Sequence, residues 1–173
     1  MRRIAATLAV VVALLFSAGA AWADYFDGHE AVKRGDYATA LREWLPLAEQ
    51  GDAKAQYNLG FMYANGWGVT ENDTEAVKWY HKAAEQGYAE AQASLGFMFD
   101  NGEGVPLNDA QAVKWYRKAA EQGHADAQNN LGVMYATGEG VPVNNVKAYM
   151  WWSLAKAEGY ENVTTYLDII KKQ

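Results

Sequence analysis

The chain has 173 residues, a formal charge of −6 and no cysteine. An acidic chain without a basic run lacks the positive surface that binds nucleic acid or anionic lipid, so neither is expected as a partner. The absence of cysteine excludes disulfide bridges and thiolate metal sites, and the fold must be stabilised by packing alone.

Residues 1–23 have the pattern of a secretory signal peptide. Arg2 and Arg3 form a basic start, an apolar run follows over residues 4–16, and Ala21-Trp22-Ala23 supplies the small residues around a cleavage site. Cleavage after Ala23 would leave a chain of charge −8 in the periplasm or outside the cell, with no stable membrane insertion. The apolar run is shorter than the about 20 residues of a membrane span, and a retained N-terminal anchor is the alternative.

Residues 24–50 predict a short helix pair. Gly35-Asp36-Tyr37 forms its turn, and the second helix carries an inward stripe of Ala40, Trp44, Leu47 and Ala48. Pro46 is expected to kink or break that helix, because proline lacks an amide hydrogen and its ring clashes with the preceding turn.

A repeat of 36 residues dominates the rest of the chain. The units over residues 51–86, 87–122 and 123–158 align without a gap. The first two match at 24 of 36 positions, and the second and third at 16 of 36. A repeat of this length indicates a solenoid, in which each unit buries its apolar face against its neighbours. The expected fold class is therefore all-α, an α/α solenoid of antiparallel helix pairs.

Each unit predicts two helices joined by a glycine-rich loop. In the first unit, the first helix runs from about Ala53 to Ala64 and ends at Asn65-Gly66, because glycine accepts the left-handed geometry of a C-cap. The second helix begins at Asn72, whose spacing to Glu75 predicts a capping box. Residues 159–173 predict a C-terminal capping helix.

Glycine also recurs inside the first helices, at Gly60, Gly96 and Gly132. Glycine at such a position costs about 1 kcal/mol relative to alanine. We therefore expect the partner helix to come too close for a Cβ atom, with small residues such as Ala76 and Ala83 facing the glycine.

Two strings carry a family resemblance. They are A-x-A-Q-x-x-L-G-x-M-[YF]-x-x-G-x-G-V at Ala53 to Val69 and A-x-x-W-Y-x-x-A-A-E-Q-G at Ala76 to Gly87, and both recur 36 residues later. They resemble the Sel-one-like repeat (SLR), a relative of the tetratricopeptide repeat, and residues 24–50 look like a plain tetratricopeptide pair. The resemblance implies a right-handed superhelix that acts as a protein-interaction scaffold, and in exported bacterial members an adaptor or regulator in the envelope. A cysteine-rich branch is credited with β-lactam hydrolysis, which we do not expect in a chain without cysteine.

No arrangement of residues points to catalysis or to a cofactor. His29, His81 and His124 lack metal-ligand spacing, and no nucleophile motif is present. Two other functions stay open as alternatives. One is an envelope hydrolase acting on peptidoglycan or a β-lactam, and the other is a glycan-binding module with exposed rings at Trp67, Trp79 or Trp115. The tryptophans that recur at 36-residue spacing are expected in the core.

A partner is expected in the groove lined by the first helices, if the tetratricopeptide pattern applies with Gly60 at its central small position. The predicted contact residues are Tyr57, Phe61, Asn65, Phe97, Asn101, Asn129 and Val133, with Trp67 from the loop. Such a strip suits an extended peptide or a helix. The alternative is that these aromatic residues only buttress the helix pairs and that Trp67 folds back on a neighbour. So short an array predicts a shallow arc and a monomer.

Overall fold

The computed structural model describes residues 25–160 and Val163. Within these residues the chain is helical and has no strand, which confirms the predicted α/α solenoid. The predicted signal peptide lies outside the described residues, and so does most of the predicted C-terminal helix. Among the described helices, none has both the length and the apolar character needed to cross a bilayer.

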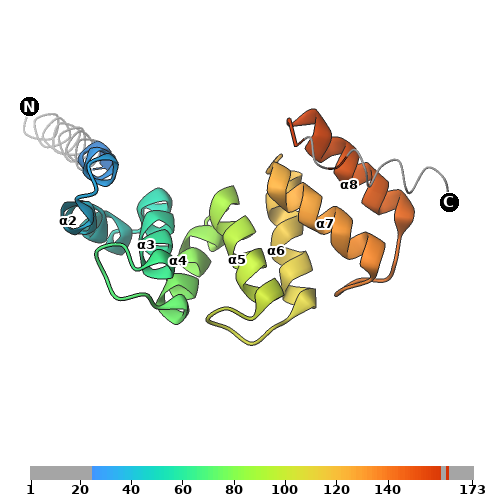
Figure 1. Cartoon of the computed structure of the whole chain (residues 1–173), viewed down its shortest axis with the longest axis horizontal. Coiled ribbons are helices and arrows are strands. Elements are labelled where there is room, and N and C mark those ends of the chain that lie inside the picture. The colour runs from blue at the N-terminus through green and yellow to red at the C-terminus, as the bar shows by residue number, and fades with distance from the viewer. Residues whose placement is uncertain (1–24, 161–162, 164–173) are drawn as a thin grey trace, which may run out of the picture.

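Over the residues that the structure describes, a helix at 25–33 is followed by seven helices of 13 residues each. They are α2 (Tyr37–Glu49), α3 (Ala53–Asn65), α4 (Asp73–Glu85), α5 (Ala89–Asn101), α6 (Asp109–Glu121), α7 (Ala125–Thr137) and α8 (Asn145–Ala157). Each helix packs against the next, so successive pairs form the shallow curved row of Figure 1.

The helix ends follow the predicted chemistry. Asn72 Oδ1 accepts a hydrogen bond from the Glu75 amide at 3.1 Å, and Asn108 makes the same bond in the next unit. Each first helix ends at a glycine with positive φ, as at Gly66 with φ of 65°. Pro46 does not break α2, which continues to Glu49. Pro46 lies in the last turn, so its missing amide removes only one bond near the helix end.

The glycines inside the first helices face aromatic rings. A Cβ on Gly60 would lie 2.6 Å from Cδ1 of Tyr80, and one on Gly96 would lie 2.7 Å from Cδ1 of Tyr116. Gly132 meets Trp152 in the same way, and Gly28 meets Trp44 in the first pair. The predicted close approach is confirmed, but its predicted cause, small residues such as Ala76 and Ala83, is wrong. Each glycine leaves room for the flat ring of the second helix.

A buried glutamine in each first helix ties neighbouring helix pairs together. Gln56, Gln92 and Gln128 are at most 4 % exposed, and each donates from Nε2 to an alanine carbonyl of the preceding pair at 3.0 to 3.1 Å. A second glutamine then donates to Oε1 of the first, Gln86 to Gln56 at 2.7 Å and Gln122 to Gln92 at 2.8 Å.

This glutamine pair is incomplete in the last unit. Position 158, which corresponds to Gln86 and Gln122, holds a glutamate, and a carboxylate has no hydrogen to donate. Gln128 Oε1 is accordingly buried without a hydrogen-bond partner. The C-terminal pair therefore lacks a bond that both preceding units have.

The second glycine of each loop makes a backbone contact with the preceding unit. Gly68, Gly104 and Gly140 have φ of 71°, 67° and 67°, a region that favours glycine. A Cβ on Gly68 would lie 2.9 Å from the backbone of Tyr37, and one on Gly104 would overlap the backbone of Asp73. In each case the loop lies against the first turn of the second helix 31 residues earlier.

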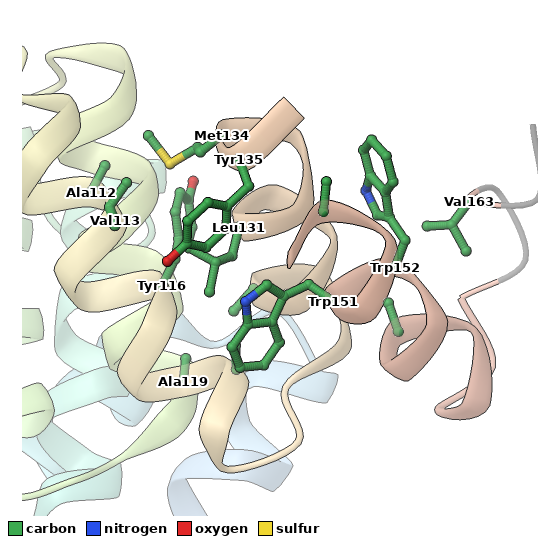
Figure 2. Packing of buried hydrophobic residues seen from close by; sticks show 14 residues of the cluster. Ala112, Val113, Tyr116, Ala119, Leu131, Met134, Tyr135, Trp151, Trp152 and Val163 are labelled. Carbon is green, nitrogen blue, oxygen red and sulfur yellow. The ribbon is translucent and has the colours of Figure 1, made fainter. Parts of the chain in front are cut away.

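The recurring tryptophans belong mostly to the core, as predicted. Trp115 and Trp151, which are 36 residues apart, are buried, and so is the neighbouring Trp152. Figure 2 shows the Trp151 ring beside the labelled side chains of α6 and α7, and Trp152 near Val163. Val163 belongs to the same cluster. Trp79 is half-buried, and the ammonium of Lys82 lies 3.8 Å from the centre of its ring.

Candidate functional site

A hollow of about 600 Å³ runs across α3, α5 and α7. We call it the first-helix groove. Its lining includes Tyr57, Phe61 and Asn65 from α3, Phe97 from α5, and Asp126 and Asn130 from α7. Phe61 is 36 % exposed and Phe97 is 47 % exposed, which is unusual for side chains of this size and apolar character. The groove therefore presents aromatic surface to solvent.

Four of the predicted contact residues, Tyr57, Phe61, Asn65 and Phe97, come together in the first-helix groove. Three others do not line it. Asn101 lies at the exposed end of α5 and donates to the Phe97 carbonyl at 3.0 Å. Val133 packs against the core cluster of α6 to α8, and Asn129 bonds to its neighbour Asn130 at 3.2 Å.

Trp67 folds back onto the protein. Its ring stacks on Tyr37 with centroids 4.7 Å apart and meets Phe61 edge-on at 5.1 Å. Trp67, Phe61 and Tyr57 line a smaller hollow of about 220 Å³, which also includes His29 and Val32. Since Phe61 and Tyr57 belong to both hollows, Trp67 extends the aromatic surface of the first-helix groove toward the N-terminal pair.

A row of polar side chains near the groove was not predicted from the sequence. Asn58, Ser94 and Asn130 are 36 residues apart and half-buried. Ser94 hydrogen-bonds to Tyr57 and Tyr80, and Asn130 hydrogen-bonds to Tyr116. The signal was present in the sequence, because each unit places a small polar residue directly before the leucine of its first helix.

Burial favours the neutral form of the tyrosines in this region, a form that the ordinary tyrosine pKa of about 10 already provides at physiological pH. Desolvation raises the pKa of Tyr57, Tyr80 and Tyr116, and it raises the pKa of Tyr88 to about 12. The negative charge of Glu90 raises the pKa of Tyr57 and Tyr88 further. At physiological pH these hydroxyl groups are therefore uncharged and able both to donate and to accept hydrogen bonds.

The histidines have local structural contacts. His29 lies 3.0 Å from the Tyr25 hydroxyl, and His81 packs edge-on to the buried Trp115. His124 Nδ1 accepts from the Ala127 amide and caps α7. Within residues 25–160 no group of three or more histidine or carboxylate side chains is arranged to hold a metal ion.

The three repeat units match a known family of helical repeats. The model of the Sel1 repeat family matches residues 53–88, 89–124 and 125–160, which is more than half of the chain. The chain belongs to the Sel1 repeat family. Sel1 repeat proteins generally act as scaffolds for protein–protein interaction and are typically not enzymes.

Solved structures share the fold. A Sel1 repeat protein from Oxalobacter formigenes is 36 % identical with a TM-score of 0.82, over 87 % of this chain and 60 % of that one. The protective antigen c5321 of uropathogenic Escherichia coli, which displays an SLR fold, is 40 % identical with a TM-score of 0.77, over 80 % of this chain and 31 % of that one. Cysteine-rich protein B of Helicobacter pylori is 23 % identical over 76 % of this chain and 95 % of that one, with a TM-score of 0.61, and shows the fold alone.

A curated relative matches a shorter segment. The DAP3-binding cell death enhancer 1 of Rattus norvegicus is 38 % identical over 63 residues, or 36 % of this chain and 12 % of that protein. The chain thus spans 60 % or less of the first two structures and a small part of the rat protein.

Proposed function

We propose that this Sel1 repeat protein is an exported scaffold that binds a protein partner in the first-helix groove and acts as an adaptor or regulator in the bacterial envelope. The exposed rings of Phe61 and Phe97 in a groove that crosses three units carry the proposal. Exposed aromatic side chains at the centre of a concave surface are typical anchors of protein interfaces. The signal-like residues 1–23 support export to the periplasm or beyond.

The groove suits a segment rather than a flat protein surface. It is open along the row of first helices, and its aromatic rings alternate with the amide of Asn65 and the side chains of Ser94 and Asn130. An extended peptide or one helix can place apolar side chains on the rings and polar groups on the amides. We propose that the scaffold does this as a monomer, which sedimentation of the purified chain tests directly.

Affinity capture tests the function. The chain without residues 1–23 is used as bait in envelope extract beside Phe61→Glu/Phe97→Glu and the uncharged Phe61→Ser/Phe97→Ser. The matched control is Leu107→Glu/Val146→Glu, which changes two exposed apolar residues outside the groove. We expect the captured protein to be lost with both groove variants and kept with the control, at unchanged helicity. A partner retained by both groove variants would contradict binding in this groove.

A further inference from the structure

The basic residues of the repeat units are concentrated on the second helices. The second helices α4, α6 and α8 carry most of the basic residues, namely Lys78, Lys82, Lys114, Arg117, Lys118, Lys147 and Lys156. The first helices α5 and α7 carry no basic residue, and their charged residues are Glu90, Asp100 and Asp126. Lys54 on α3 is at the position equivalent to Glu90, but it lines a neighbouring hollow rather than the first-helix groove.

Three carboxylates from separate segments line the groove. Glu90 stands at the start of α5, Asp126 at the start of α7, and Glu103 in the loop after α5. All three are exposed, and the salt bridges of the described residues involve none of them. Among the described residues that line the groove there is no lysine or arginine, and the basic side chain that does line it, His124, caps α7 through Nδ1. The carboxylates therefore outnumber the basic groups on this surface.

The aromatic surface lies in the same hollow as these carboxylates. Phe61 and Phe97 present ring surface, and Tyr57 presents a ring with a neutral hydroxyl group. Carboxylates beside aromatic rings can bind a side chain that has a long apolar stem and a positively charged end. Arginine fits better than lysine, because its planar guanidinium stacks on rings and pairs with carboxylates through two hydrogen bonds.

We propose that the partner enters the first-helix groove with an extended segment that carries two arginines, one facing Glu90 and Asp126 at the helix starts and one facing Glu103 beyond the end of α5, with their stems on Phe61 and Phe97. This inference rests on the proposed function, since it specifies the chemistry of the segment that the groove binds. Because the carboxylates are exposed, the attraction weakens as salt shortens the range of electrostatic interactions.

Fluorescence anisotropy with two synthetic peptides tests the inference. The probe is a labelled peptide of glycine, phenylalanine, leucine and two arginines, and its control contains citrulline, which keeps the shape of arginine without the charge. We expect the arginine peptide to bind the purified chain about fivefold to tenfold more tightly, the range that a few exposed ion pairs provide. This preference should shrink when salt rises from about 0.01 to about 0.15 M, as the Debye length falls from about 30 to about 8 Å. Equal binding of the two peptides, or no binding of either, would overturn the inference.

Isosteric variants distinguish a failure of this inference from a failure of the proposed function. Glu90→Gln/Glu103→Gln/Asp126→Asn should remove the preference for arginine, whereas the control Glu85→Gln/Glu121→Gln, which neutralises two exposed glutamates on second helices, should keep it. If a partner captured from extract is lost with Phe61→Ser/Phe97→Ser but kept with the triple variant, the groove binds a segment without arginine and only this inference fails. If the partner is kept with both, the proposed function fails as well.

Discussion

Replacing Gly60 by alanine sets two effects of opposite sign against each other. Alanine is better than glycine in a helix by about 1 kcal/mol. The new Cβ would, however, lie 2.6 Å from Cδ1 and 2.7 Å from Cε1 of Tyr80, a ring that is 4 % exposed and fixed in the core. Carbon atoms normally pack about 3.5–4.0 Å apart, and overpacking of a core costs about 1–3 kcal/mol. The contacts are short enough to place the cost in the upper part of that range.

We therefore expect Gly60→Ala to lower the stability by roughly 1–2 kcal/mol. For a chain of this size that is a fall in Tm of roughly 3–10 °C, measured by circular dichroism and checked by urea unfolding. The variant Tyr80→Leu supplies the matched background, because it removes the ring that the Cβ would meet. There Gly60→Ala should be neutral or stabilising. A rise in Tm for Gly60→Ala in the unaltered chain would show that helix propensity outweighs the contact and would refute the packing argument.

Glu158→Gln should raise the stability by about 1 kcal/mol, because the new amide can donate to the unpaired Gln128 Oε1; an unchanged or lower urea midpoint would contradict this. Burial raises the pKa of Asp100, so its contribution to stability is present below the pKa of the unfolded carboxyl and is lost as pH rises through the raised value. Asp100→Asn should accordingly raise Tm near pH 7, by an increase in the free energy of unfolding of at most about 0.5 kcal/mol, since the charge is partly solvated. Below about pH 3 the substitution should have no effect on Tm. Equal Tm differences at both pH values would contradict this. Burial also raises the pKa of Tyr88 to about 12, above the value of about 10 in the unfolded chain. Stability should therefore fall as pH rises from about 10 to 12, and tyrosinate absorbance that develops fully without loss of helicity would disprove it.

The helices could be predicted because their signals are local and repeated. The 36-residue period, the asparagine caps and the C-terminal glycines act within a few residues, and they place α3 to α8 correctly. The effect of Pro46 depended on its place in the last turn, which required the helix end to be known. The neighbours of Gly60 depend on the rotation of one helix against another, and the signal for them in the sequence is the aromatic residue that recurs 20 positions after each glycine.

The groove was predicted for its first two units and less well for the third. Tyr57, Phe61 and Phe97 face it because the pattern of a regular helix carries over from one unit to the next. In α7 the groove receives Asn130, which was not predicted, while Asn129 does not line it and Val133 packs against the core around α8. Which side of α7 faces the groove depends on the curvature of the array and on the large tryptophans of α8, and neither follows from the pattern of one helix.

The loop glycines have a consequence for how such chains grow in evolution. Gly68, Gly104 and Gly140 each touch the helix start 31 residues earlier, so every junction between units is made by the same pair of positions. A duplicated block of 36 residues contains both partners of the next contact. They are the loop glycine, which contacts the preceding unit, and the start of the second helix, which the glycine of the following unit contacts. In-frame duplication of residues 87–122 should therefore yield a folded chain without any new interface having to arise. The number of repeat units can then change by duplication, and with it the length of the surface that the first helices line.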